Sequence, residues 1–184
     1  MMREVIQMAF IKQLNTTHKI LTWDNVLSDA KDKNIALMPF DIYSYIDTFD
    51  DIKIINDDLS LEISGMIEYT NGRFIFRINK NHSEGRRRFT LAHEFAHYSL
   101  HKEYLKTTKM ISEKSTLFVT TEFRKNLKEI EANEFATNIL LPKDEFIGVI
   151  KSGKTKLGDI AEHFCVSASA VKYRAYELDL IKDY

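Results

Sequence analysis

The sequence predicts an α+β fold in which a small antiparallel β-sheet packs on one long buried helix, with further helices on either side. Three observations support this. Only two prolines and six glycines interrupt the 184 residues, so most of the chain is free to form helices. A central stretch instead carries short β-branched and aromatic runs, which favour strands. With 44% hydrophobic residues, the chain can bury one core of ordinary size.

The first half of the chain is predicted to supply two helices and the sheet. Apolar residues spaced three and four apart predict helices at Leu21–Asn34 and Asp41–Asp50. Three further runs predict strands at Ile52–Ile55, Met66–Tyr69 and Phe74–Ile78. Asn71-Gly72, between the last two runs, indicates a tight hairpin turn because both residue types tolerate positive φ.

Two long helices are predicted after the sheet. The first spans about Ser83–His101, and apolar residues on both of its sides predict that it is buried between the sheet and other helices. The second spans about Glu122–Leu141 and ends before Pro142, which cannot continue a helix. The polar segment between them is predicted to hold at most a short strand, at Leu117–Val119.

The C-terminal part, Leu157–Leu180, is predicted to form two short helices joined around Val166-Ser167, as in a helix-turn-helix unit. We expect residues 1–152 to form one domain and residues 153–184 a helical tail packed on it. From Lys151 to Tyr184 there are six Lys or Arg and five Asp or Glu, too balanced for the phosphate contacts that carry affinity for DNA. Direct nucleic-acid binding is therefore not expected, and a DNA-binding regulator with a structural metal site is kept as an alternative.

Charge and cysteine content exclude several classes of protein. Lys and Arg total 26 against 27 Asp and Glu, so no strong field attracts nucleic acid or an anionic membrane. No run approaches the roughly 18 apolar residues of a membrane-spanning helix, and no secretory leader is evident, so we expect a cytoplasmic protein. Cys165 is the single cysteine, which excludes an internal disulfide, and we expect it to be buried.

The run His93-Glu94-Phe95-Ala96-His97 carries the clearest chemistry. Residues four apart on a helix face the same side about 6 Å apart, so His93 and His97 can offer two imidazole nitrogens to one Zn²⁺ ion. Glu94 lies about 100° around the helix, beside the ligand face, where it can act as a general base. Bound Zn²⁺ lowers the pKa of its water toward about 7, so the run predicts peptide hydrolysis. The alternative is a pair of histidines satisfied within the core.

A third ligand is expected from the second long helix. Its buried stripe is formed by Ala132, Phe135, Ala136 and Ile139. At about 100° per residue, Glu129 lies within roughly 60° of the centre of that stripe, whereas Glu131 and Glu134 lie about 110° or more away. Glu129 is therefore the predicted ligand, with an ordinary solvated glutamate as the alternative. Replacement of Glu131 is predicted to leave zinc binding intact.

Three further polar features have more than one interpretation. Asn133 lies on the same edge as Glu129 and can orient His93, as metal-bound histidines usually require, or it can be a plain surface amide. His101 lies roughly 80° around from His93, which favours a surface or hydrogen-bonding role over ligation. The Arg86-Arg87-Arg88 cluster is interpreted as a solvated first turn, with a clamp for a substrate carboxylate as the alternative.

These residues together resemble the ImmA/IrrE family of metallopeptidases, including small proteins paired with repressors on prophages and integrative elements. The matching runs are Arg88–His97, Leu100-His101, Glu129–Ala136 and Leu140-Leu141-Pro142. The resemblance covers roughly Ile35–Leu180. Many peptidase families share the zinc motif, but its combination with the Glu-x-x-x-Asn helix and Leu-Leu-Pro is specific. Phe95-Ala96 departs from the aliphatic residue and glycine that relatives often have.

The resemblance implies a zincin-like core with His93, His97 and Glu129 on Zn²⁺ and Glu94 as the base. It also implies a protein substrate, a helix-turn-helix repressor, and the short, ImmA-like form without an additional sensor domain. In zincins an extended substrate commonly pairs with the sheet edge, which suggests Phe74–Ile78 as the substrate-binding strand. The toxin of a toxin–antitoxin pair, acting on another protein with the same zinc chemistry, is the remaining alternative.

Overall fold

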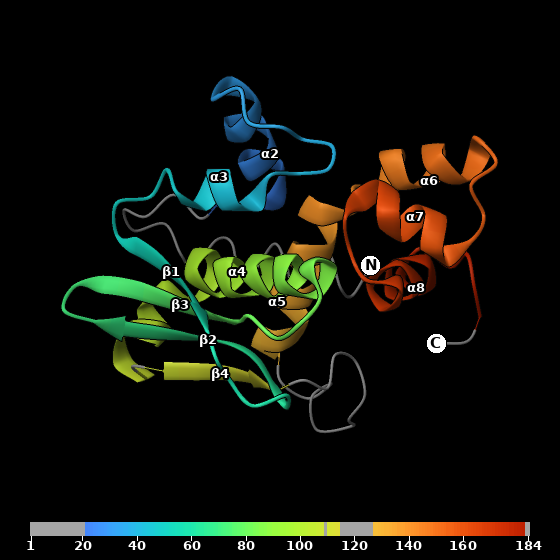
Figure 1. Cartoon of the computed structure of the whole chain (residues 1–184). Helices are drawn as coiled ribbons and strands as arrows, with labels where there is room; N and C mark the ends of the chain where they lie inside the picture. Colours follow the sequence, from blue (N-terminus) through green and yellow to red (C-terminus); the bar gives the residue numbers. More distant parts are fainter. Residues whose placement is uncertain (1–20, 109, 115–126, 183–184) are drawn as a thin grey trace.

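The computed structural model describes residues 21–108, 110–114 and 127–182 (Figure 1). The first four described helices are α2 (Trp23–Asp32), α3 (Ile42–Ile46), α4 (Glu84–Thr108) and α5 (Leu127–Leu140). Side chains cap the first two, since Thr22 and Asp41 accept hydrogen bonds from the first free backbone amides. The predicted α+β fold class is confirmed.

A four-stranded sheet of order β1-β3-β2-β4 lies under α4 (Figure 1). Its strands are β1 (Ile52–Asp57), β2 (Ile63–Thr70), β3 (Arg73–Asn79) and β4 (Met110–Lys114). β2 and β3 form the predicted antiparallel hairpin. Its turn residues, Asn71 and Gly72, adopt φ angles of 50° and 79°, the positive values that a two-residue turn requires. β4 pairs antiparallel with β2.

The first strand differs from the prediction. β1 pairs in parallel with β3, so the sheet is mixed and not wholly antiparallel. Residues 58–62 carry the chain past the end of β3, and the buried amide of Asn79 holds them by donating to the carbonyl oxygens of Leu59, Ser60 and Ile63 at 3.2, 2.9 and 2.8 Å. β3 is therefore flanked on both sides, and the prediction that Phe74–Ile78 forms a substrate-binding edge is wrong.

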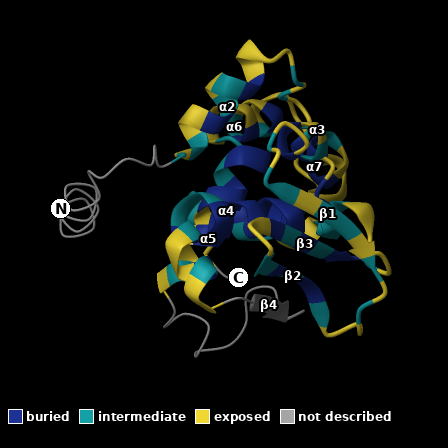
Figure 2. Ribbon diagram, turned by 90° about the vertical axis from the view of Figure 1, so that its left-hand side faces the viewer, coloured by how far each residue is buried: buried dark blue, intermediate teal, exposed yellow. Residues whose placement is uncertain are grey.

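Helix α4 runs through the centre of the molecule (Figure 2). Its residues from Arg88 to Tyr98 are all buried, as the apolar residues on both of its sides predict. It packs against β2 and β3 on one side and against α5 on another. The helix departs from helical geometry at His101 (φ −123°, ψ 22°) and continues to Thr108, beyond its predicted end.

The close approach of β2 to α4 depends on Gly65. A Cβ atom at this position would lie 2.5 Å from Cγ2 of Thr90 and 3.1 Å from the carbonyl oxygen of Arg77. Packed carbon atoms normally remain about 3.5–4.0 Å apart, so any side chain here would push the strand and the helix away from each other. The same Cβ would lie 3.3 Å from Oε1 of Glu94, so this close contact lies beside the run from His93 to His97.

Three helices follow α5, namely α6 (Lys143–Lys151), α7 (Leu157–Phe164) and α8 (Ala168–Glu177). α7 and α8 form the predicted helical pair. Cys165 joins them with a φ of 51° and is exposed, so the expectation that it is buried is wrong; a left-handed residue at the end of a helix turns the chain outward. α6 was not predicted, because Pro142 ends one helix and also begins the next.

The turn between α7 and α8 packs on the first turns of α4. Arg88 donates from Nε to the carbonyl oxygen of Cys165 at 2.9 Å and from Nη2 to that of Phe40 at 2.6 Å. A Cβ at Gly85 would lie 2.5 Å from the backbone carbon of Val166. The interpretation of the arginine cluster as a solvated turn is therefore wrong for Arg88, which is a buried connector between three segments.

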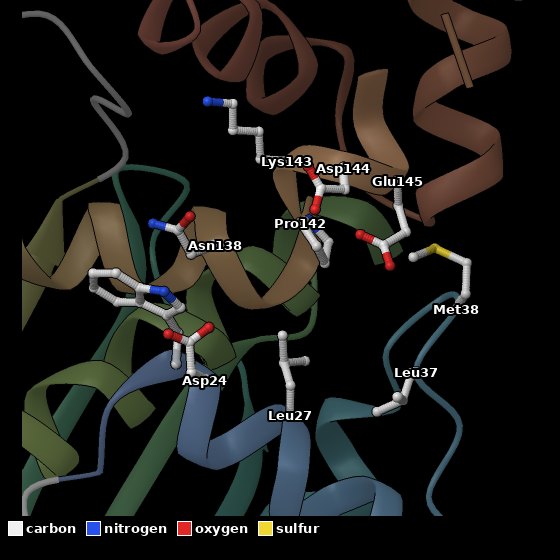
Figure 3. A pocket seen from close by; sticks show the side chains of 10 residues that line it. Asp24, Leu27, Leu37, Met38, Asn138, Pro142, Lys143, Asp144 and Glu145 are labelled. Carbon is white, nitrogen blue, oxygen red and sulfur yellow. The ribbon is translucent and has the colours of Figure 1, made fainter. Parts of the chain in front are cut away.

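A pocket of about 370 Å³ lies between α2 and the start of α6 (Figure 3). Its walls include Leu27, Leu37 and Pro142, and no residue predicted for the metal site lines it.

No helix in the described part of the chain is long and apolar enough to cross a membrane. The strand predicted at Leu117–Val119 and the predicted start of the second long helix at Glu122 lie outside the described residues.

Candidate metal centre

Helices α4 and α5 bring three candidate ligand groups together. Nε2 of His93 lies 3.1 Å from Nε2 of His97 and 3.1 Å from Oε2 of Glu129, while Nε2 of His97 lies 3.4 Å from Oε1 of Glu129. The histidines are 1% and 0% exposed, and the glutamate side chain is 14% exposed. The three residues predicted as metal ligands thus form one compact group.

The local sequence explains this convergence. One turn of α4 separates His93 from His97, so the two rings lie on the same side of the helix with centroids 4.7 Å apart. Glu129 stands in the first turn of α5. Ala132 and Ala136, which follow it on the same helix, are fully buried and small, so they allow α5 to pack closely against α4.

Burial and mutual contact set the protonation of the group. Removal from water lowers the pKa of His97 to about 4, in spite of the nearby carboxylate. Burial alone would raise the pKa of Glu129, but the adjacent imidazoles of His93 and His97 outweigh burial and hold that pKa well below its usual range. At neutral pH the cluster therefore contains a neutral imidazole and an ionised carboxylate, which are the forms that bind metal ions.

Contacts on the far side of each ring fix where the ring protons lie. Nδ1 of His93 lies 3.0 Å from Oδ1 of Asn133, an acceptor, so Nδ1–H donates. Nδ1 of His97 lies 3.0 Å from Nδ1 of His101, whose Nε2 lies 2.9 Å from Oε2 of Glu131. The carboxylate accepts the His101 Nε2–H, which leaves His101 Nδ1 to accept from His97. Both Nε2 atoms inside the cluster then carry lone pairs and no proton.

This arrangement fits a divalent metal ion. Two nitrogen lone pairs and a carboxylate oxygen that face one another repel unless a cation lies among them. Around tetrahedral Zn²⁺, with bonds of roughly 2.0–2.1 Å, neighbouring ligand atoms stand about 3.3 Å apart. The two Nε2 atoms are 3.1 Å apart, and each lies 3.1 or 3.4 Å from one of the two oxygens of the Glu129 carboxylate, which is close to this spacing. Three protein ligands would also leave free the fourth position that catalytic zinc sites keep open.

Glu94 lies beside the ligand group and not within it. It follows His93 in α4, is 1% exposed, and is absent from the set of converging ligand atoms. Because successive helix residues are about 100° apart, its carboxylate projects next to the histidine face, toward β2 at Gly65. A base that acts on water near a metal ion is expected beside the ligands and not among them.

Sequence reasoning located Asn133 but missed Glu131. Asn133 is 5% exposed and contacts His93 from α5. Helical periodicity places Glu131 away from the buried stripe of α5, and its side chain is 46% exposed. Its carboxylate nevertheless contacts Nε2 of His101. The signal that could have found it is the spacing of His101, four residues after His97, which continues the histidine face of α4 by one turn.

Comparison with known proteins places this site in a family. The model of the peptidase family described as the IrrE N-terminal-like domain matches residues 50–176, a range that contains the whole histidine and glutamate cluster. The chain belongs to the ImmA/IrrE family of metallopeptidases. This ImmA/IrrE protein is also 33% identical, over 123 residues, to "Uncharacterized immunity region protein 2" of Bacillus phage phi105. The alignment covers 67% of this chain and 70% of the phage protein.

A solved structure shares the fold. The ImmA/IrrE chain superposes on a Mycobacterium tuberculosis transcriptional regulator with a TM-score of 0.58 at 18% sequence identity. The match covers 83% of this chain but 45% of the regulator, so the chain spans less than half of that protein's length. The similarity establishes a common architecture for the matched part.

Proposed function

We propose that this ImmA/IrrE protein is a zinc-dependent endopeptidase, with His93, His97 and Glu129 as zinc ligands and Glu94 as the general base. The observation that carries the proposal is the convergence of three lone-pair-bearing groups at 3.1–3.4 Å, which a bound cation would relieve. Two imidazoles and one carboxylate form a donor set that suits Zn²⁺. Membership of a metallopeptidase family supports the choice of reaction.

Each protein group has a definite part in this reaction. When bound, Zn²⁺ supplies a water molecule of lowered pKa and polarises the carbonyl of the peptide bond. Glu94 accepts the proton of the attacking water and delivers it to the leaving amine. Asn133 holds the ring of His93 so that Nε2 faces the ion, which keeps one ligand in place through the reaction.

For the substrate, we propose a helix-turn-helix transcriptional repressor of a prophage or mobile element. The resemblance to family members that are paired with such repressors supports this choice. Similarity to a phage protein whose name places it in an immunity region supports it as well. Cleavage would remove the repressor and relieve repression.

Metal analysis and cleavage by matched variants test the proposal. Purified wild type is expected to carry one zinc ion and to cleave the repressor encoded beside its gene, with fragments identified by mass spectrometry. Glu94→Gln should keep zinc and lose activity by about 10²–10⁴-fold, because it removes proton transfer alone. Glu129→Ala should lose most of its zinc. Glu134→Ala, an exposed position on the same helix, serves as the control and should retain both properties.

Two results would contradict separate parts of the proposal. Wild type that binds no zinc, or Glu129→Ala that binds it normally, would remove the assigned metal centre. A zinc-loaded protein that leaves the repressor intact would remove the substrate. Growth arrest on expression that depends on Glu94 would then favour a toxin with a different protein target.

We also propose that residues 1–152 form the catalytic domain and residues 153–184 a helical tail packed on it. Arg174, in α8, is 4% exposed and donates to the carbonyl oxygen of Leu141 at 2.9 Å and to Oδ1 of Asn138 at 2.9 Å. Both acceptors stand at the end of the helix that carries Glu129. These contacts support a tail that braces α5.

A further inference from the structure

We propose that His101 and Glu131 form a two-residue hydrogen-bond relay that positions His97 as a metal ligand. The inference rests on the proposed metal centre and adds two residues to it. The ring of His93 contacts the amide of Asn133, whereas the ring of His97 contacts a second imidazole with a carboxylate behind it. The two ligand histidines are therefore oriented by different chemistry.

The geometry of the relay is continuous. Nδ1 of His97 and Nδ1 of His101 lie 3.0 Å apart, and Nε2 of His101 lies 2.9 Å from Oε2 of Glu131. Both imidazoles are largely buried, at 0% and 9% exposure, so water competes weakly for their ring nitrogens. The irregular backbone of α4 occurs at His101 itself, where one ring contacts both the preceding turn and α5.

The direction of the proton donors follows from the chemistry of each group. An ionised carboxylate only accepts, so Glu131 takes the Nε2–H of His101. The neutral His101 ring then has an acceptor at Nδ1 and receives the Nδ1–H of His97. His97 is left with its lone pair at Nε2, the atom that faces Glu129 and His93. The relay thus selects the tautomer of His97 that can bind a metal ion.

His101 is a positioning residue and not a fourth ligand. Its two ring nitrogens are directed at His97 and Glu131, and neither belongs to the group of converging ligand atoms. This assignment replaces the expectation from helical periodicity that Glu131 has no influence on zinc. Since Glu131 is half-exposed, it should contribute less to zinc affinity than His101 does.

Zinc affinity, measured by competition with a chromophoric chelator, tests the relay without reference to peptidase activity. Loss of a partner behind a metal-bound histidine typically weakens metal binding about 10–100-fold, and His101→Ala should fall in this range. His101→Gln should stay within about 5-fold of wild type, because an amide can accept from His97 and donate to Glu131. Glu131→Ala should weaken binding about 3–10-fold, and the exposed neighbour Glu134→Ala should leave it unchanged.

A double-mutant cycle separates a relay from two independent structural effects. Glu131 acts only through His101, so Glu131→Ala should weaken binding no further once His101→Ala is present. In the Co²⁺-loaded protein, His101→Ala should also shift the visible ligand-field bands, whereas Glu134→Ala should not. Circular dichroism and thermal melting of the metal-free variants show whether each one folds. If His101→Ala does not fold, His101→Gln still tests the relay.

The outcomes that overturn the relay are distinct from those that overturn the proposed function. If wild type binds zinc tightly but His101→Ala binds it equally well, the relay is wrong and the metal centre stands. Additive losses in the double variant would likewise contradict the relay. If wild type binds no zinc at all, the proposed function fails together with the relay, and Glu129→Ala shows no difference from wild type.

Discussion

The two halves of α4 bury polar groups in opposite ways. In the first turns Arg88 is 8% exposed, and its guanidinium donates to the carbonyl oxygens of Phe40 and Cys165. In the middle of the helix His93 and His97 are at least as buried, but their Nε2 atoms face each other and a carboxylate. Donors meet acceptors in the first region, whereas acceptors meet acceptors in the second.

The buried polar groups of α4 are therefore of two kinds: those that stabilise the fold and those that are arranged to bind a ligand. Buried polar groups in folded proteins are nearly always hydrogen-bonded, and a buried group without a partner costs about 1–3 kcal/mol. A bound cation can offset that cost in a cluster of acceptors, because a ligand that binds only the folded state stabilises it. Replacing a matched donor should therefore reduce stability, whereas replacing a clustered acceptor should reduce metal binding.

The largest effect on stability is expected from Arg88→Ala. The variant removes the charged donor from the carbonyl oxygens of Phe40 and Cys165 at the junction of α4 with the tail. Charged hydrogen bonds of this kind contribute about 1.5–3 kcal/mol each, so the free energy of unfolding should fall by about 3 kcal/mol and the Tm by roughly 6–12 °C. Zinc affinity should remain within about 2-fold of wild type, since Arg88 lies outside the metal group.

Arg87→Ala is the matched control for Arg88→Ala. Arg87 precedes Arg88 in the chain, but it is partly exposed and pairs with Glu84 at the surface of the same helix. Exposed ion pairs contribute about 0–1 kcal/mol, so its Tm should change by at most a few degrees. Equal destabilisation by both variants, or a loss of zinc affinity in Arg88→Ala, would contradict the separation between the two regions.

The sequence predicts the part of the site that a single helix determines. The i, i+4 spacing of His93 and His97 fixes their common face whatever surrounds them. Periodicity also selected Glu129 from several glutamates, because only one lies near the apolar stripe of its helix. The contact between His101 and Glu131 depends on how two helices cross and on an irregular turn, neither of which appears in a residue pattern.

Features that depend on long-range contacts were predicted less well. The parallel pairing of β1 follows from the path of residues 58–62 across the end of β3, which Asn79 holds from twenty residues further along the chain. The exposure of Cys165 follows from a left-handed turn, although its apolar neighbours favour burial. The hairpin at Asn71-Gly72 was predicted correctly because the turn residues themselves determine it.

A smaller effect is expected from Gly65→Ala, which tests how the metal region is packed. The added Cβ would lie 2.5 Å from Cγ2 of Thr90, and separating β2 from α4 should cost about 1–3 kcal/mol of the free energy of unfolding. The same atom would crowd the carboxylate of Glu94 at 3.3 Å. Cleavage should therefore fall further than zinc affinity, as measured by kcat/KM beside chelator competition.

Gly148→Ala provides the control for this glycine. Gly148 stands within α6, and a Cβ at this position would meet no atom of another described segment within 4 Å. Alanine favours the helix over glycine by about 1 kcal/mol, so this variant should be as stable as wild type or slightly more stable, with unchanged cleavage. If Gly65→Ala loses zinc in proportion to its loss of cleavage, β2 supports the zinc ligands and not the general base Glu94.

The smallest effect is expected from two tyrosines of α3 that differ in hydrogen bonding. The hydroxyl of Tyr43 is buried and has no hydrogen-bond partner among the residues that the structure describes, whereas that of Tyr45 donates to Asp29 at 3.0 Å. Tyr43→Phe should leave the free energy of unfolding unchanged or raise it by up to about 1 kcal/mol. Tyr45→Phe should lower it by about 1 kcal/mol, as measured by urea denaturation.

Which of these two variants is the less stable matters more than how large the changes in their free energies of unfolding are. If Tyr45→Phe is the less stable of the two, the energy of a buried polar atom in this protein depends on whether it has a partner, and the acceptors around His93 and His97 need a cation for the same reason. If Tyr43→Phe is instead the less stable, a buried polar atom without a partner can be an ordinary structural component here. The clustered nitrogens and carboxylate would then no longer imply a metal ion, and only direct measurement of bound zinc could support one.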